Sequence, residues 1–361
     1  MRIPRRAAPR NDKRKAALLN DKTKTVLLIA SLFGLAAAAS APLTFPRDHG
    51  SHPDAKVEWW YYTGHLTGAA KREYGFQLTF FRAADLHLAH FAWTDVARQT
   101  FLYEEKSHLN LPGIASAALD RLDVTNEDWS VSESNGVHRL HARGRQGELD
   151  LELSPVKPPL LHGEDGISRK GPRANEYSHY VSITRLAASG RFRKSERWEK
   201  VQGTAWFDHE WGPGALPREA RGWDWFAVVL DDGSELMLYR LRTAAGATTP
   251  FSSGTFSPRE GVPEPIRWND LEFEETAFWK SPHSGGRYPA RWRIAVPSLG
   301  LDLDIEPQVA DQELVTEQST GVTYWEGTCR VAGKRRGRAV TGRAYAELTG
   351  YARRDVPGFA P

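Results

Sequence analysis

Two stretches of the 361-residue sequence share one pattern. Residues 201–208 read VQGTAWFD and residues 340–347 read VTGRAYAE, so both follow V-x-G-x-A-aromatic-x-acid. A second pair is looser, since an acid and two aromatic residues open a predicted strand at residues 58–60 (EWW) and at residues 224–226 (DWF). Repeated patterns of this kind indicate one structural unit present twice. We therefore expect two related β-units with a boundary in the Gly/Pro-rich segment 212–221.

Alternation of apolar and polar residues with a period of two is the main signal from residue 45 onward. Residues 148–153 alternate acids with leucine, residues 301–306 alternate Leu or Ile with acids, and residues 74–80 place Tyr, Phe or Leu at every second position. Residues 231–234 (DDGS) separate two apolar runs and are typical of a tight hairpin turn. Many short strands without a long amphipathic helix predict an all-β protein built of antiparallel barrels or sandwiches.

Composition and length agree with a folded chain of two domains. The sequence is 40% hydrophobic and 26% charged, and its 31 Gly and 22 Pro are spread along the length. This excludes collagen-like, wholly disordered and multi-span membrane proteins. The net charge is +3, but residues 1–24 hold nine Lys/Arg against two Asp, so the rest of the chain sums to −4. We therefore expect no nucleic-acid partner.

The basic N-terminal stretch is followed by an apolar run at residues 25–39 (TVLLIASLFGLAAAA). This run is shorter than the roughly twenty residues of a membrane-spanning helix, and it ends in small residues that suit signal-peptidase cleavage. We predict a leader and signal peptide at residues 1–41, cleavage after Ala39, and a periplasmic or secreted protein that meets the membrane only before cleavage. An uncleaved membrane anchor is the alternative. Cys329 is the single cysteine, so no intramolecular disulfide is expected.

Residues 208–212 (DHEWG) are the strongest candidate for chemistry, because they place two carboxylates, an imidazole and an indole at the end of an apolar strand. In the second unit the acid has a counterpart in Glu347, whereas residues 209–211 face Leu, Thr and Gly. The duplicated scaffold therefore does not require the His-Glu-Trp. Two interpretations are open: acid–base groups of an active site, or a buried hydrogen-bond network in which the shared acid is framework and pairs with an arginine.

Asp224 lies between two tryptophans on a strand that is otherwise apolar. Burial raises the pKa of a carboxylate unless a cation pairs with it, and a neutral carboxylic acid in an apolar pocket can act as a general acid. The alternative is an ion pair with Arg221, Arg240 or Arg242. Glu58, on an equally aromatic strand, permits the same two interpretations.

Known catalytic motifs and metal-ligand spacings are absent. The sequence has no G-x-S-x-G, Walker, G-x-G-x-x-G or H-E-x-x-H motif. The pairs His87/His90 and His138/His141 lie in predicted strands, where residues three apart point to opposite faces and cannot chelate. His49 and His52 lie in a loop and form at most a partial site, since zinc needs three or four ligands. We therefore predict no metal and no cofactor.

Several segments resemble the AttH-like, carotenoid 1,2-hydratase (hydroxyneurosporene synthase) superfamily of double lipocalin-like proteins. The distinctive ones are residues 203–212 (GTAWFDHEWG), 222–226 (GWDWF) and 58–61 (EWWY), and matching segments spread over residues 45–351. The resemblance implies two consecutive lipocalin-like (calycin) antiparallel β-barrels after the signal segment. We place an N-terminal domain at residues 42–215 and a C-terminal domain at residues 216–361.

In the hydratase branch of this superfamily, water adds across a terminal isoprenoid double bond without a cofactor. The resemblance implies His209 and Trp211 as matching site residues, with Asp224 as the proton donor. The superfamily also holds members described as secreted hydrolases and members linked to ABC-transporter operons, and the leader favours that branch. We expect an exported protein that binds an apolar, lipid- or isoprenoid-like ligand. It would act as a hydratase of the carotenoid 1,2-hydratase type, as a secreted hydrolase, or as a non-enzymatic carrier working with an ABC-transporter permease.

The mechanism that these residues suggest is protonation of an alkene by Asp224, stabilisation of the carbocation by aromatic faces, and removal of a proton from the attacking water by His209. Asp208 or Glu210 would orient His209. The predicted catalytic residues are Asp224, His209, Glu210 and Asp208. The predicted ligand-binding residues are Trp211, Trp60, Glu58, Tyr180, Trp206 and Phe226. This hypothesis requires His209 and Asp224 to project into one shared apolar cavity.

Overall fold

The computed structural model describes residues 42–194, 196–214 and 216–352, and these residues form two antiparallel β-sheets without an α-helix. Four short 3-10 turns occur, η1 (Arg47–His49), η2 (Ala69–Lys71), η3 (Trp268–Asp270) and η4 (Pro297–Leu299). Within the described ranges, no helix has the length and apolar character of a transmembrane span. The predicted signal peptide and its cleavage site at Ala39 lie outside the described residues.

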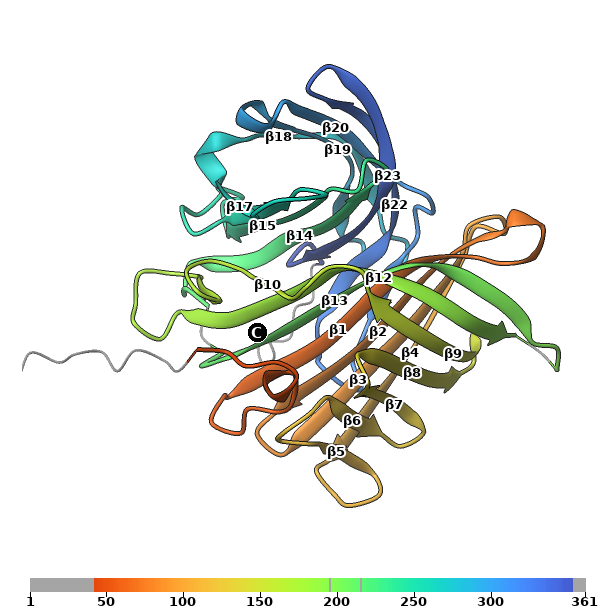
Figure 1. The fold of residues 1–361 in the computed structure, drawn as a ribbon. Helices are drawn as coiled ribbons and strands as arrows, with labels where there is room; N and C mark the ends of the chain where they lie inside the picture. The colour runs from red at the N-terminus through yellow and green to blue at the C-terminus, as the bar shows by residue number, and fades with distance from the viewer. Residues whose placement is uncertain (1–41, 195, 215, 353–361) are drawn as a thin grey trace, which may run out of the picture. The chain divides into compact units, whose positions relative to one another are not determined.

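The first sheet curls into a nearly closed barrel (Figure 1). Its order is β4-β3-β2-β1-β13-β12-β9-β8-β7-β6-β5, with β10 and β11 pairing with β12. Its strands are β1 (Val57–Thr67), β2 (Glu73–Ala83), β3 (Leu86–Asp95), β4 (Thr100–Leu109), β5 (Ala115–Ala117), β6 (Asp123–Asn126), β7 (Trp129–Ser134), β8 (Val137–Gly144), β9 (Gly147–Pro155), β10 (Leu160–Leu161), β11 (Ile167–Arg169), β12 (Tyr177–Arg193) and β13 (Glu199–Gly212).

The second sheet repeats this plan, with order β17-β16-β15-β14-β23-β22-β20-β19-β18 and β21 pairing with β22. In each sheet the first long strand lies between its hairpin partner and the last strand. The prediction of an all-β, double lipocalin-like fold is confirmed. The strands are β14 (Ala220–Leu230), β15 (Glu235–Thr243), β16 (Ser253–Ser257), β17 (Glu264–Arg267), β18 (Glu272–Lys280), β19 (Arg287–Val296), β20 (Leu301–Pro307), β21 (Glu313–Val315), β22 (Thr323–Arg335) and β23 (Arg338–Thr349).

The repeated V-x-G-x-A pattern forms the last strand of each sheet, β13 and β23, and its glycine has a steric role. A Cβ atom on Gly203 would lie 1.9 Å from the His65 carbonyl oxygen, and one on Gly342 would lie 2.4 Å from the Val229 carbonyl oxygen. Both are far inside van der Waals contact, so the last strand can approach the first strand of its sheet only through glycine. The sequence repeat therefore marks the strand that pairs with the first long strand of each sheet.

Each barrel is filled by side chains at alternate strand positions. Trp60 and Tyr62 of β1 point inward with Phe76, Leu78 and Phe80 of β2, and all are almost fully buried. In the second sheet, β20 buries positions 301, 303 and 305 and leaves the two intervening acids more accessible. These are the strands in which the period-two alternation predicted buried and accessible faces.

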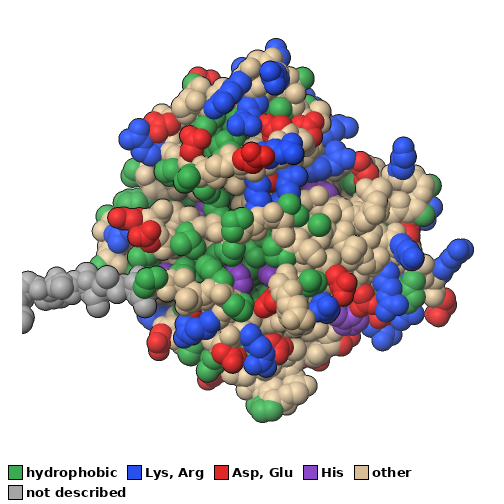
Figure 2. Space-filling view, viewed as in Figure 1, with side chains coloured by type: hydrophobic (Ala, Val, Ile, Leu, Met, Phe, Trp, Pro, Cys, Tyr) green, Lys and Arg blue, Asp and Glu red, His purple; other side chains and the backbone are tan. Residues whose placement is uncertain are grey.

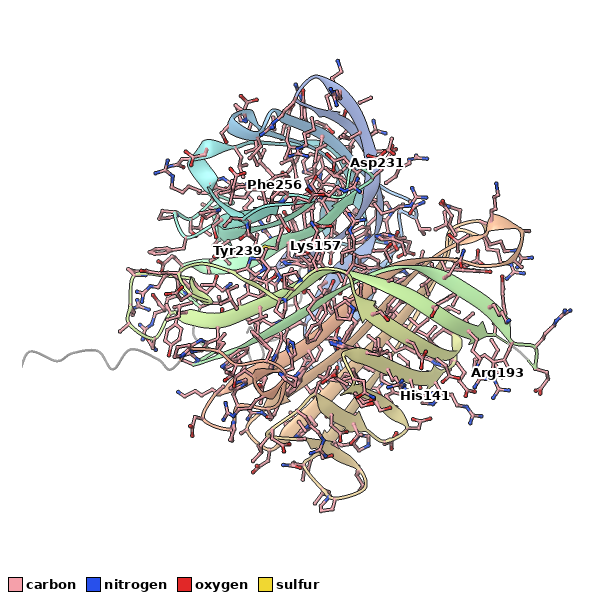
Figure 3. The ribbon with its side chains drawn as sticks, viewed as in Figure 1. His141, Lys157, Arg193, Asp231, Tyr239 and Phe256 are labelled. Atoms are coloured by element: carbon pink, nitrogen blue, oxygen red, sulfur yellow. The ribbon has the colours of Figure 1, made fainter. Side chains whose placement is uncertain are left out.

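The outer faces of the two sheets pack against each other along a contact that we call the seam. Tyr61, Tyr180 and Trp206 of the first sheet pack there with Trp225 and Tyr239 of the second sheet. Figure 3 shows Tyr239 and Lys157 in the region where the two sheets meet. Strands β1 and β13 therefore have two buried faces, one in the first barrel and one in the seam.

A buried ionic cluster ties the first sheet to the β14–β15 hairpin. Glu235 is fully buried and accepts hydrogen bonds from Lys157 Nζ and, at 2.5 Å, from Arg185 Nε. Lys157 also donates to the carbonyl oxygens of Gly233 and Pro258, at 3.0 and 2.7 Å. One carboxylate thus compensates two cations that the first sheet contributes to the seam.

Replacing Glu235 with alanine should destabilise the protein, because Lys157 and Arg185 would lose their buried counter-charge. We expect a loss of about 3–5 kcal/mol, the usual cost of breaking a buried ion pair, seen as a lower denaturation midpoint by circular dichroism. Asp302→Ala is the control, since it removes an exposed partner of Arg293 and should leave the midpoint nearly unchanged. Equal midpoints for the two variants would show that the cluster does not stabilise the seam.

Candidate functional site

A cavity of about 120 Å³ lies in the seam. Its walls are mainly aromatic, and Figure 2 shows hydrophobic side chains gathered in the middle of the face where the two sheets meet. The aromatic lining includes Trp59, Tyr61, Tyr180, Trp223, Trp225 and Tyr239. Four carboxyl groups also line it, those of Asp208, Glu210, Glu326 and Glu347. Lys170 is the one Lys or Arg among the described lining residues.

Asp208 is held by three neutral donors. Tyr180 Oη donates to Oδ2 at 2.6 Å, and Trp206 Nε1 and Ser182 Oγ donate to Oδ1. Burial raises the pKa of Asp208 to about 7, although these hydrogen bonds oppose the rise. The interpretation that the shared acid pairs with an arginine is wrong, since its described ion-pair and hydrogen-bond partners are two hydroxyls and an indole.

Glu326 and Glu347 are opposite each other on β22 and β23. Burial raises the pKa of Glu326 well above its usual range, and the neighbouring Glu347 adds to the rise. Burial also raises the pKa of Glu347 to about 7, with a hydrogen bond from Trp223 opposing it and the carboxylates of Glu210 and Asp208 adding to it. Both effects favour the protonated form of Glu326.

The hydrogen bonding of Glu326 agrees with a protonated carboxyl. Tyr61 Oη donates to Glu326 Oε1 at 2.5 Å, whereas Glu326 Oε2 has no hydrogen-bond partner among the described residues. Gln77, which neighbours Glu326, has an unpaired buried oxygen of its own, Oε1. Buried acceptors normally find a donor, and a proton on Glu326 Oε2 would let that atom donate instead of remaining an unpaired acceptor.

Glu210 differs from the other three acids because a cation compensates it. Lys170 Nζ lies 3.1 Å from Glu210 Oε1, and Ser178 Oγ donates to the same oxygen. The ammonium also lies over the rings of Tyr239 and Tyr180, 4.1 and 5.2 Å from their centroids. Burial opposes the charge of Lys170, but Glu210 outweighs that effect and raises the pKa of Lys170. The cavity thus contains one ion pair and three carboxyls that lack a cation.

His209 and Trp211 point the other way, into the first barrel, because neighbouring residues of β13 alternate between its two faces. His209 Nε2 lies 3.0 Å from Glu58 Oε1, and Nδ1 lies 3.2 Å from the Asp48 carbonyl oxygen. The imidazole stacks on Trp60, with ring centroids 5.0 Å apart. The structure therefore brings His209, Trp60 and Glu58 together away from the cavity carboxyls, whereas Trp211 contacts His209 and is also part of the cavity lining.

Glu58 is the centre of this second group. It accepts hydrogen bonds from His52 Nδ1 at 2.9 Å, Ser51 Oγ at 2.8 Å and Arg82 Nε at 3.0 Å. Burial opposes its ionisation, but the hydrogen bonds from His209 and His52 outweigh burial and hold the pKa of Glu58 well below its usual range. Glu58 could have been a free acid in an apolar pocket or a carboxylate paired with a cation, and the structure agrees with the second interpretation.

Asp224 lies in a third place, inside the second barrel. It accepts hydrogen bonds from Arg242 Nε at 2.9 Å, Arg240 Nη1 at 3.3 Å and Tyr351 Oη at 2.9 Å. Burial pushes the pKa of Asp224 upward, and the two guanidinium groups oppose this. Asp224 is therefore the partner of two arginines, Arg240 and Arg242, which is the ion-pair alternative, and it is not an acid free of cations.

The hypothesis that Asp224 and His209 act in one shared cavity is therefore wrong. The predicted residues divide among three places: Asp208, Glu210, Tyr180 and Trp206 in the seam, the His209 group in the first barrel, and Asp224 in the second. Phe226 belongs to the core of the second barrel, 5.2 Å from Trp292 between ring centroids. The physical reason is strand alternation, which separates Asp208 from His209 although they are adjacent in sequence.

Comparisons with known proteins agree with this architecture. The sequence model of the AttH-like family matches residues 36–351. This chain belongs to the AttH-like family. The crystal structure of an AttH candidate from Nitrosomonas europaea is 34% identical and has a TM-score of 0.80, covering 87% of this chain and 98% of that one. No curated protein matches the chain.

Two more distant structures share the fold of this AttH-like protein. Kievitone hydratase from Nectria haematococca is 14% identical with a TM-score of 0.71, covering 86% of this chain and 94% of its own. The structure of CghA with Sch210972 is 12% identical with a TM-score of 0.53, covering 83% and 89%. The resemblance to the AttH-like family is thus confirmed, and kievitone hydratase and CghA share its fold.

Sequence reasoning missed Glu326, Glu347 and Lys170 as site residues of this AttH-like protein. A signal for Glu326 was present, because residues 324–326 (YWE) place an acid after two aromatic residues, as at Glu58. Glu347 was visible as the counterpart of Asp208. No sequence pattern indicated that Glu326 and Glu347 lie side by side, since that depends on the pairing of β22 with β23. None indicated that they share a cavity with Asp208, since that depends on how the two sheets pack.

The raised pKa of Glu347 should make stability depend on pH. Glutamate ionises near pH 4.5 in the unfolded chain and near pH 7 in the folded protein, so unfolding releases a proton between these values and stability falls as pH rises. Buried histidines with lowered pKa values act in the opposite sense in acid, so the comparison needs a variant. The free energy of unfolding of the wild type, relative to Glu347→Gln, should fall by at most about 3 kcal/mol between pH 4.5 and pH 7.

Denaturant titrations at several pH values measure this difference. Glu152→Gln, at an exposed position on β9, is the control and should track the wild type at every pH. A wild-type curve parallel to that of Glu347→Gln would show that Glu347 ionises normally.

Proposed function

We propose that this AttH-like protein binds an apolar, alkene-bearing ligand in the seam cavity and catalyses cofactor-free addition of water to the double bond. The observation that carries the proposal is a buried carboxyl, Glu326, in a cavity with aromatic walls, where burial raises its pKa well above the usual range. Such an acid can protonate a substrate that offers no basic atom. The fold that this chain shares with kievitone hydratase also supports the addition of water as the reaction type.

The size of the cavity limits the ligand. A cavity of 150 Å³ lined by hydrocarbon side chains binds benzene in another protein, so about 120 Å³ accommodates one isoprene-sized unit. A longer isoprenoid would place its reacting end in the seam and the rest outside. The enclosed volume is too small for a whole carotenoid.

The cavity residues can account for each step of hydration. Glu326 gives its proton to one alkene carbon, forming a C–H bond and leaving a carbocation on the other carbon. The faces of Trp59 and Trp225 each stabilise that cation by about 0.5–2 kcal/mol. The oxygen of a water molecule then bonds to the cation, and a carboxylate takes up the released proton.

Glu347 is suited to be this base, because its pKa near 7 leaves a large anionic fraction at neutral pH. It lies opposite Glu326 across neighbouring strands. Transfer of the proton from Glu347 back to Glu326 restores both groups, so the net reaction is the addition of one water. Glu210 is not needed for this cycle, since Lys170 and Ser178 hold it as a paired anion.

Glu326→Gln should lower the rate of hydration by about 10²–10⁴-fold, since it removes the acidic proton and keeps the shape of the side chain. The assay incubates the protein with a panel of short isoprenoid alkenes in H₂¹⁸O and detects the labelled alcohol by mass spectrometry. Quenching of tryptophan fluorescence measures ligand binding, which the variant should retain. Glu152→Gln is the control and should match the wild type.

Full hydration activity in Glu326→Gln would remove Glu326 from the mechanism. Native mass spectrometry distinguishes an enzyme from the alternative, a non-enzymatic carrier that works with a transporter. If wild type and Glu326→Gln hold the same ligand in equal, stoichiometric and unmodified form, and neither forms labelled alcohol, the protein is a carrier and the enzymatic proposal fails.

We also propose that the protein is exported, on the strength of the basic and apolar leader at residues 1–41. The expected result is that protein recovered from the periplasm or medium begins at Ser40. N-terminal sequencing checks this. A mature chain that retains the apolar run and sediments with membranes would identify the leader as an uncleaved anchor.

A further inference from the structure

Three metal-binding side chains converge in the first barrel, apart from the seam cavity. His52 follows η1, Glu58 lies on β1, and His209 lies on β13. One ligand atom from each, His52 Nδ1, Glu58 Oε1 and His209 Nε2, lies within 4.8 Å of the others. The sequence offered His49 and His52 as a partial site only, and the pairing of β1 with β13 supplies the missing ligands.

The two ring nitrogens of His209 have different neighbours, and these decide whether one nitrogen can bind a metal ion. Nδ1 lies 3.2 Å from the Asp48 carbonyl oxygen, which can only accept a hydrogen bond, so a tautomer protonated at Nδ1 has a partner there. In that tautomer the lone pair of Nε2 is directed at the Glu58 carboxylate, 3.0 Å away, and a metal ion can take the place of the hydrogen bond between them. Two acceptors facing each other in a buried place repel unless a cation lies between them.

His52 has the same arrangement. Its Nδ1 points at Glu58 Oε1, at 2.9 Å, and its Nε2 lies 3.7 Å from Asp48 Oδ1. Metal-bound histidines usually direct their other ring nitrogen to a carbonyl or carboxylate, which fixes the tautomer. Asp48 offers one such acceptor to each histidine, its backbone oxygen to His209 and its carboxylate to His52.

We infer that His52, Glu58 and His209 form a binding site for a divalent transition-metal ion, Zn²⁺ in the first instance. Two imidazoles and one carboxylate suit zinc, whereas Mg²⁺ and Ca²⁺ prefer oxygen ligands alone. Arg82 and Ser51 bind Glu58 Oε2, and the His52 backbone N–H donates to Oε1 at 3.0 Å and to Oε2 at 3.1 Å, so Oε1 keeps one lone pair for the metal. His52 is 19% exposed, so the fourth position lies toward solvent, as in zinc sites that keep a water ligand.

Other histidine–carboxylate pairs of the described chain lack this convergence. His141 pairs with Asp150, and His283 pairs with Asp311, but each pair offers two ligands at accessible positions. Figure 3 shows His141 on the first barrel, well away from the seam residues Lys157 and Tyr239. Each of these two accessible pairs is a salt bridge, whereas His52, Glu58 and His209 bring three possible ligands together from separate elements.

The test uses the full chain freed of metal by a chelator and titrated with ZnCl₂. Isothermal titration and elemental analysis of the dialysed protein should give one Zn²⁺ per chain for the wild type. Co²⁺ in its place should give visible d–d absorption, and MgCl₂ should give no binding. Bound Zn²⁺ should also raise the melting temperature, since it binds the folded state.

His52→Ala is the decisive variant, because His52 is a partly exposed loop residue whose loss should leave the barrel folded. Its imidazole stacks on Trp211, with centroids 3.9 Å apart, and His179 stacks on the same indole at 5.2 Å. His179→Ala is therefore the matched control, since it loses a comparable ring contact without losing a ligand. We expect His52→Ala to lose stoichiometric binding and the Co²⁺ absorption, and His179→Ala to keep both.

Two outcomes would overturn the inference. Absence of Zn²⁺ binding and of Co²⁺ absorption in the wild type would mean that a second proton on His209 occupies the place between the imidazole and Glu58. Unchanged stoichiometry and absorption in His52→Ala, with circular dichroism like that of the wild type, would place any bound metal elsewhere on the chain. Neither outcome affects the seam acids, so the hydratase proposal is tested independently.

Discussion

The double burial of strand β13 is the constraint on which the chemistry of this protein depends. One face of β13 fills the first barrel and the other face lies in the seam, so every side chain from Asp208 to Trp211 is buried. Alternation sends Asp208 and Glu210 to the seam, and His209 and Trp211 to the barrel. One short segment therefore supplies two groups of ionisable residues that differ in partners and in charge.

The buried carboxyl groups differ in how many basic side chains lie beside them to compensate a negative charge. Glu235 and Asp224 each accept hydrogen bonds from two basic side chains. In the seam cavity, Lys170 compensates Glu210 alone, and the carboxyls of Asp208, Glu326 and Glu347 meet hydroxyls, indoles and one another. Desolvation then favours the protonated form of these three acids. Aromatic walls without arginine thus turn ordinary acids into proton donors.

Duplication of the barrel explains why the seam carries acids from both halves. Asp208 and Glu347 occupy matching positions of the repeated strand pattern, and the two closing strands present them to the same cavity. The halves differ elsewhere, since the first barrel encloses the His52, Glu58 and His209 group and the second encloses Asp224 with its arginines. A shared framework therefore carries one common site in the seam and a different ionic cluster in each barrel.

The sequence by itself determined the all-β class, the two related units, the hairpin at residues 231–234 and the family, because alternation, turn residues and distinctive motifs are local properties of the chain. It also singled out Asp208, His209, Glu210 and Asp224 as ionisable residues beside apolar and aromatic strand positions. Only the tertiary structure decided which of them meet. That Glu326 lies beside Glu347 on a neighbouring strand, and that Asp224 meets two arginines in a different barrel, follows from strand pairing and sheet packing over long separations, which no local pattern encodes.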